Sequence, residues 1–109
     1  MRKYETLLLF SPELSVENRK EILDNFGAIV TREKGQTIAL DDWGSRELAY
    51  SVKKFTRGNY IRLEYAGPGP LVAELERNIR ITEGILKFVT VVLDENFQAE
   101  AESIQAEEK

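Results

Sequence analysis

The spacing of apolar residues along the chain predicts four strands and two helices. Apolar runs at residues 3–10 and 85–93 are typical of strands. The second run is so rich in β-branched residues that we expect it at the centre of a sheet. Residues 59–66 alternate between apolar and polar positions, which predicts a strand with one face turned to water.

Apolar residues at helical spacing predict the two helices. The first begins after Ser15, an N-cap residue, and keeps its apolar phase to about Lys34, where Gly35 stops it. In an alternative interpretation this helix ends at Gly27 and the residues that follow form a strand, but the unbroken phase favours the longer helix. The second helix is short and has Pro70 at its first position.

Between the two helices, residues 36–43 and 46–53 predict one long strand with a bulge at Gly44. The sequence FTRGN at residues 55–59 predicts the turn into the next strand. The order is therefore β-α-β-β-α-β, the ferredoxin-like α+β pattern, in which two helices cover one face of a four-stranded antiparallel sheet. Many functions use this architecture, so the fold alone decides none of them.

The composition is that of one soluble globular domain, and it excludes several kinds of chemistry. The chain has 109 residues, 42% of them hydrophobic and 31% charged. It has no cysteine, which excludes disulfides and thiolate metal sites, and no histidine, the commonest general base and metal ligand. We predict no cofactor and no metal. No apolar run approaches the length of a signal sequence or a membrane span, so we expect a cytoplasmic protein.

The formal net charge of −4 conceals a division along the chain. Residues 94–109 carry −5, whereas residues 1–93 carry +1. We therefore expect a near-neutral domain at residues 1–94 and an acidic, disordered tail at residues 95–109. Within the domain, residues 43–62 hold five cations against one glutamate, a local charge that suits a phosphate backbone.

Cations and aromatic residues alternate in the first strand and in the hairpin of the second and third strands, as they do in RNA-binding surfaces. The candidate RNA-binding residues are Arg2, Lys3, Arg46, Lys53, Lys54 and Arg57, together with Arg62. The interleaved aromatic residues are Tyr4, Trp43, Tyr50 and Tyr60. Other interpretations stay open: Leu48 and Tyr50 as core residues, Trp43 as a plug in the bulge, and Arg62 with Glu64 as a solvated pair.

Catalysis has little support in the sequence. Asp41 and Asp42 are adjacent on a strand, so their side chains point to opposite faces and are poorly placed to share a proton or a metal ion. The only weak phosphate cradle is the FTRGN segment with Arg57 and Asn59, which keeps a small phosphate-ester hydrolase open as an alternative. A ferredoxin-like dimerisation module is a further alternative.

Three segments resemble the bacterial ribosomal small-subunit protein six family: WGSRELAYSVKKFTRGNY at 43–60, the start MRKYETLLLF, and the block LERNIRITEGILKFVTVV. The resemblance covers roughly residues 1–94. The chain differs from the family where Ser51 and Val52 replace a usual proline and isoleucine. It also lacks the second basic residue that is usual where Ser45 or Glu47 stands, which weakens the basic stretch.

The resemblance implies a non-catalytic structural protein of the small ribosomal subunit that acts in translation and subunit assembly. It implies binding to the central domain of 16S ribosomal RNA as a pair with small-subunit protein eighteen. By the same resemblance Arg2, Arg46, Lys53 and Lys54 face RNA, and the partner interface holds Leu48 and Tyr50, to which we add Trp43 and Tyr60. The isolated chain is expected to be a monomer.

Overall fold

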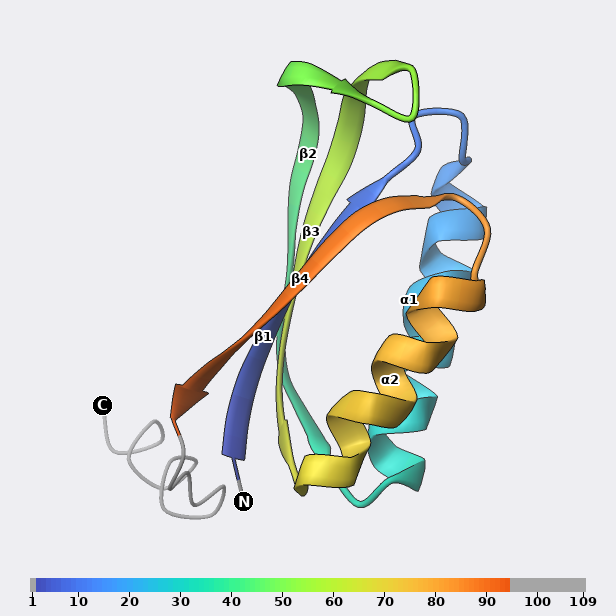
Figure 1. Cartoon of the computed structure of the whole chain (residues 1–109). Helices are drawn as coiled ribbons and strands as arrows, with labels where there is room; N and C mark the ends of the chain where they lie inside the picture. The colour runs from blue at the N-terminus through green and yellow to red at the C-terminus, as the bar shows by residue number, and fades with distance from the viewer. Residues whose placement is uncertain (1, 95–109) are drawn as a thin grey trace, which may run out of the picture.

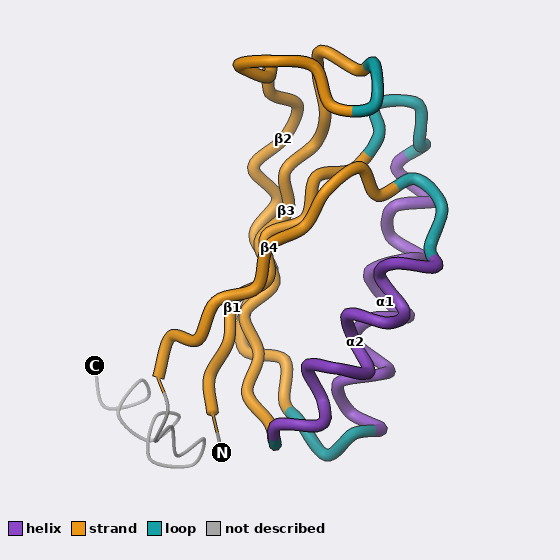
Figure 2. Tube along the Cα trace, in the orientation of Figure 1, coloured by secondary structure: helices purple, strands orange, loops and turns teal. Residues whose placement is uncertain are grey.

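The computed structural model describes residues 2–94, so the predicted tail lies outside the described residues. The elements follow the predicted order: β1 (Arg2–Phe10), α1 (Val16–Arg32), β2 (Gln36–Val52), β3 (Phe55–Gly67), α2 (Gly69–Ile81) and β4 (Ile85–Asp94). All four strands form one antiparallel sheet in the order β2-β3-β1-β4. Both helices lie on one side of the sheet, and the other face stays open (Figures 1 and 2). The predicted α+β ferredoxin-like fold is confirmed.

β4 lies at an edge of the sheet, and our prediction that it is central was wrong. The central strands are β1 and β3. β-Branched residues suit any strand that is partly covered, so the run could not distinguish an edge from a centre. An edge strand has a neighbour on one side only, which leaves apolar side chains of β4 exposed. They are Val89, Val91, Val92 and Leu93.

The core lies between the helices and the face of the sheet that they cover. Every second residue of β1 points into it, because side chains alternate along a strand. Its buried side chains include Tyr4, Leu8, Phe10, Phe26, Val30, Ile61, Leu63, Tyr65, Leu71, Leu75 and Ile79. One polar cluster is buried with them, where the Thr6 hydroxyl lies 2.9 Å from the Tyr65 hydroxyl and 2.8 Å from that of Thr90. Burial raises the pKa of Tyr65.

The longer of the two predictions for α1 is confirmed, because the helix continues through Gly27 to Arg32. Ser15 is its N-cap and accepts a hydrogen bond from the Asn18 amide at 3.1 Å. The helix ends about two residues before the predicted position. The residue that leaves the helix in a left-handed conformation is Lys34, with φ of 68°, and not Gly35.

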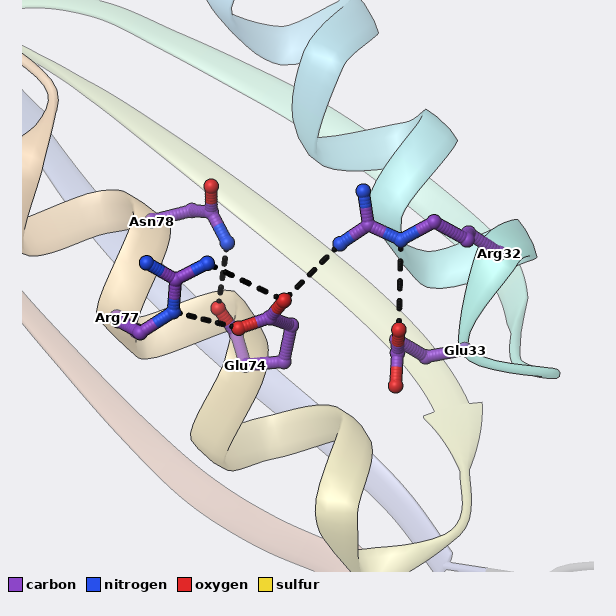
Figure 3. Close-up of polar contacts among 5 residues, drawn as sticks. All are labelled: Arg32, Glu33, Glu74, Arg77 and Asn78. Atoms are coloured by element: carbon purple, nitrogen blue, oxygen red, sulfur yellow. Dashed lines mark hydrogen bonds and ion pairs between the residues drawn. The ribbon is translucent and has the colours of Figure 1, made fainter.

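Glu74 of α2 joins the two helices on their solvent side (Figure 3). Its Oε2 accepts a hydrogen bond from Arg32 of α1 at 3.1 Å, and its Oε1 accepts one from Arg77 at 2.7 Å. Arg32 also pairs with Glu33 at 3.3 Å. The bond from Arg77 and the charges of both arginines lower the pKa of Glu74. This exposed network adds little stability, but it keeps both arginines occupied on the face away from the sheet.

The turn between β2 and β3 lies at Lys53 and Lys54, so our prediction of a turn at FTRGN was wrong. Residues 55–59 belong to β3. Gly58 is required there by close packing and not by a turn: a Cβ on it would meet a Leu9 methyl group and lie 3.0 Å from the Phe10 carbonyl oxygen. Glycine and asparagine are typical turn residues, which explains the wrong prediction, but here both lie inside β3.

Candidate nucleic-acid interface

The hairpin of β2 and β3 extends beyond the rest of the sheet. The last pair between β1 and β3 is Phe10 with Asn59, whereas β2 and β3 continue to pair up to Val52 with Phe55. Residues 45–58 therefore form a two-stranded arm, which projects at the top of Figure 1. The arm carries four cations and one carboxylate, Glu47, which gives it a net charge of +3.

Two irregularities shape the arm, and the predicted bulge at Gly44 is one of them. Asp42 pairs with Ile61 and Gly44 with Tyr60, so Trp43 is an extra residue on β2. Gly44 has φ of +78°, which explains why glycine suits this position. Its amide donates a 2.8 Å hydrogen bond to the Asp42 carboxylate, which holds the bulge closed.

The second irregularity lies near the tip. Between the pairs Glu47–Arg57 and Val52–Phe55, β2 has four intervening residues and β3 has one. Tyr50 lies in this unpaired excess and is 74% exposed, while Leu48 is half-buried. The interpretation of Tyr50 as a core residue was therefore wrong. Trp43 is 45% exposed, so it does not fill a cavity at the bulge either.

The cations of the arm differ in how far the protein itself engages them. Arg57 bonds to the Ser45 hydroxyl at 3.3 Å and reaches Glu47 at 4.0 Å. Arg46 donates to the Trp43 carbonyl at 3.1 Å, and no carboxylate in the described part of the chain lies at ion-pair distance from it. Within residues 2–94, no carboxylate lies at ion-pair distance from Lys53 or Lys54. Both lysines are exposed at the tip of the arm.

The turn at Lys53 and Lys54 is conformationally costly. Their φ angles are 50° and 72°, in the left-handed region that disfavours residues with a Cβ. A two-residue hairpin turn with both φ angles positive is of the type that Asn-Gly usually occupies. The chain places two lysines there instead, and strained residues of this kind gather at functional sites.

Arg2 and Lys3 lie at the opposite end of the sheet from the arm. Arg2 pairs with Gly67, ten residues along β3 from Arg57, a separation of roughly 33 Å at strand spacing. Lys3 forms a 3.0 Å ion pair with Glu64. Our expectation that these two residues share one surface with the arm was wrong. β3 does pair with both β1 and β2, as predicted, but it is too long for neighbouring strands to imply neighbouring residues.

A charge network crosses the open face of the sheet between those two ends. Arg62 of β3 pairs with Glu5 of β1, with Asp41 of β2 at 3.1 Å, and with Glu64 of its own strand. With Lys3 included, these five residues, called here the sheet network, carry a net charge of −1. Side chains of Arg62 and Glu64 are only 19% and 12% exposed, so the interpretation of the two as a solvated pair was wrong.

The sheet network shifts the pKa values of its central pair. Hydrogen bonds to Glu64 and Glu5 raise the pKa of Arg62 still further above the physiological range. Burial alone would raise the pKa of Glu64, but hydrogen bonds from Arg62 and Lys3 outweigh it and hold that pKa below its usual value. Both groups are therefore charged at neutral pH, and Arg62 is committed to the protein's own carboxylates.

Beside the sheet network, the open face is mostly apolar. Leu7 and Leu9 of β1, Tyr60 of β3, and Lys87, Phe88 and Val89 of β4 line a shallow pocket of about 230 Å³. Val91 and Leu93 continue the exposed apolar surface along β4. We call six of these residues the apolar sheet face: Leu7, Leu9, Tyr60, Val89, Val91 and Leu93. Of the six, our sequence reasoning selected only Tyr60. Val89, Val91 and Leu93 are every second residue of β4, so they lie on one face of the strand. This spacing could have indicated an apolar surface there.

Neither α1 nor α2 is long and apolar enough to cross a membrane. Among residues 2–94, no three acidic side chains gather in a way that could hold a metal ion.

The fold and the arm together define a ferredoxin-like domain with a basic β-hairpin extension, an arrangement compatible with a ribonucleoprotein component. Residues 3–92 match the family model described as "Ribosomal protein S6". The chain belongs to the ribosomal protein S6 family of the small ribosomal subunit. This is a family of structural proteins without enzymatic activity, located in the bacterial cytoplasm.

Relatives and solved structures agree with this assignment. The chain is 59% identical over 100 residues to small ribosomal subunit protein bS6 of Desulfovibrio desulfuricans, which covers 92% of the chain and 98% of the relative. It is 48% identical to bS6 of Solidesulfovibrio magneticus, with the same coverage. The crystal structure of 30S ribosomal protein S6 from Thermotoga maritima superposes with a TM-score of 0.79 at 27% identity and covers 97% of each chain. A crystal structure of an Arabidopsis thaliana protein, at 15% identity and a TM-score of 0.54, covers 90% of this chain and 98% of its own and shares the fold alone.

Proposed function

We propose that this small-subunit protein binds the central domain of 16S ribosomal RNA as a pair with small-subunit protein eighteen, and acts there in translation and subunit assembly. The observation that carries the proposal is the arm, which presents Arg46, Lys53 and Lys54 away from the protein's own carboxylates. Unpaired cations on a projecting hairpin can neutralise phosphates without first giving up an internal partner.

Two separate surfaces support the division between RNA and protein partner. The arm is basic, whereas the open face combines the apolar sheet face with the sheet network of net charge −1. The partner is basic in the family that the sequence resembles, and the three carboxylates of the sheet network offer a basic protein complementary charge beside the apolar residues. We therefore assign the RNA to the cations of the arm and the protein partner to the open face. Leu48 and Tyr50, which lie near the tip of the arm, remain partner candidates from the family resemblance.

The sequence-based candidates divide accordingly. Arg46, Lys53 and Lys54 remain RNA-binding candidates, with Arg57 in a lesser role because Glu47 lies within 4.0 Å of it. Tyr60 remains a partner candidate through its place on the open face, and Trp43 through its exposure beside the arm. Arg2 and Lys3 would need a separate RNA contact at the far end of the sheet.

A gel-shift titration tests the proposal. The probe is a fragment of the central domain of 16S ribosomal RNA, titrated with the chain alone, with the partner alone, and with both. We expect weak binding by the chain alone and much tighter binding when the partner is present, because two proteins then share the phosphate contacts and the ordering cost. Equal affinity of the chain with and without the partner would refute the pairing.

Light scattering of the isolated chain addresses the dimerisation alternative. We expect a monomer, since the open face is reserved for a different protein. A stable homodimer at micromolar concentration would mean that the apolar sheet face joins two copies of this chain.

A further inference from the structure

We infer that a second RNA-backbone site, a pocket for a phosphate group, lies between the tip of the arm and the corner where α2 meets β4. The pocket has a volume of about 330 Å³, at the lower end of the range of small-ligand sites. Its lining comes from three parts of the fold: Lys53 of the turn at the arm's tip, Ile79 and Arg80 of α2, and Ile85, Leu86, Lys87 and Phe88 of β4. This inference rests on the proposed RNA binding.

Charge is the first argument for a phosphate. Three of the seven lining residues are cations, Lys53, Arg80 and Lys87, and none is acidic. Within residues 2–94, no carboxylate lies at ion-pair distance from Lys53 or Lys87, while Arg80 has one exposed partner, Glu76, at 3.4 Å. Like charges that line one pocket repel one another, and a bound anion reduces that repulsion.

The floor of the pocket is the second argument, and it favours a nucleotide chain over a free anion. Ile79, Ile85 and Leu86 are at most 9% exposed and form an apolar base. The guanidinium carbon of Arg80 lies over the Phe88 ring, 5.6 Å from its centre, in a cation–π contact. Bases of unpaired RNA stack on aromatic and arginine side chains while phosphates meet the cations beside them.

Continuity with the arm is the third argument. In Figure 1 the tip of the arm bends toward the side of the sheet that carries the helices. Lys53 thus belongs both to the arm and to the pocket, and Lys54 is its neighbour in the turn. One RNA strand could follow Lys54, Lys53 and Lys87 in succession. A basic protein partner fits this surface poorly, because like charges across an interface are unfavourable.

The test uses the full chain with its partner on the central-domain fragment of 16S ribosomal RNA. The pocket variant is Arg80→Gln with Lys87→Gln, which leaves Lys53 in place. The matched control is Lys20→Gln with Arg77→Gln, which removes two cations from the helical layer. We expect the pocket variant to bind about tenfold more weakly near 0.1 M salt, with a shallower salt dependence, and the control to bind as the unaltered chain does.

A second measurement locates the RNA without removing a cation. The chain has no cysteine, so Glu83→Cys, in the turn between α2 and β4, supplies a unique attachment point for an iron chelate that cleaves nearby RNA. We expect backbone cleavage from this position and none from Lys20→Cys.

The outcomes separate the two proposals. An RNA affinity that falls with changes at Lys53 and Lys54 but not in the pocket variant, with no cleavage from Glu83→Cys, would overturn the pocket and leave the proposed function intact. A complex with the partner that binds no RNA at all would overturn both.

Discussion

The cations at the centre of the sheet and those at the tip of the arm are the same kinds of residue in opposite surroundings. Arg62 lies among Glu5, Asp41 and Glu64, and it is only 19% exposed. Lys53 and Lys54 stand in solvent, and no carboxylate of residues 2–94 lies at ion-pair distance from them. Arg62 joins three strands, whereas the lysines hold nothing together. A count of cations along the sequence therefore overstates the charge that is available to RNA, because some cations are already paired with carboxylates of the protein.

The comparison predicts first that Arg62 matters for stability. Arg62→Met leaves three carboxylates close together on a partly buried face, so we expect the free energy of unfolding at pH 7 to fall by about 2 kcal/mol. Urea denaturation followed by circular dichroism measures this change. In the arm, Arg46→Met removes an exposed cation that donates to a backbone carbonyl, and we expect a change within about 0.5 kcal/mol. Similar losses in both variants would erase the distinction between the two groups.

In the arm, by contrast, substitutions that suit the conformation of the turn should increase the free energy of unfolding. Lys53→Asn with Lys54→Gly places the preferred residues in a turn whose φ angles are both positive, so we expect the chain to become more stable by about 1 kcal/mol. The same variant should bind the ribosomal RNA fragment about tenfold more weakly, because two phosphate contacts are lost. Thermal unfolding and gel shift measure the two effects. A variant that is stabilised and binds RNA normally would show that the strained lysines have no role in binding.

Element order and fold class follow from local patterns, such as the helical phase that continues through Gly27 and the alternation of residues 59–66. The bulge at Gly44 was predictable because a glycine interrupts a strand there. The basic character of residues 45–58 was also visible in the sequence, since charge counts need no coordinates.

Other features depend on register, which one sequence does not reveal. Arg62 meets Glu5 and Asp41 only because β3 pairs with β1 and β2 at particular residues. The turn was missed because lysines give no turn signal, while Gly58 imitates one for the sake of close packing against Leu9. The separation of Arg2 from the arm follows from the length of β3. The exposure of the apolar sheet face follows in part from the position of β4 at the edge of the sheet.

The smallest expected effect is a pH dependence of stability that the sheet network should show and the arm should not. The pKa of Glu64 is lower in the folded chain than in the unfolded chain, so its ionised form contributes stability above the unfolded value, near 4.5. That contribution is lost as the pH falls through the lower, folded value.

Glu64→Gln isolates this contribution, because the amide keeps a hydrogen-bond acceptor and cannot titrate. We expect the unaltered chain to be more stable than Glu64→Gln at pH 6, and the difference between them to shrink steadily as urea denaturation is repeated at pH 5, 4 and 3. In the arm, Glu47 is 81% exposed and 4.0 Å from Arg57, so Glu47→Gln should differ little from the unaltered chain at any of these pH values. A constant difference for Glu64→Gln would mean that its carboxylate contributes packing and not charge. The charges of the sheet network would then add nothing to stability, and only the burial of its side chains would distinguish it from the arm.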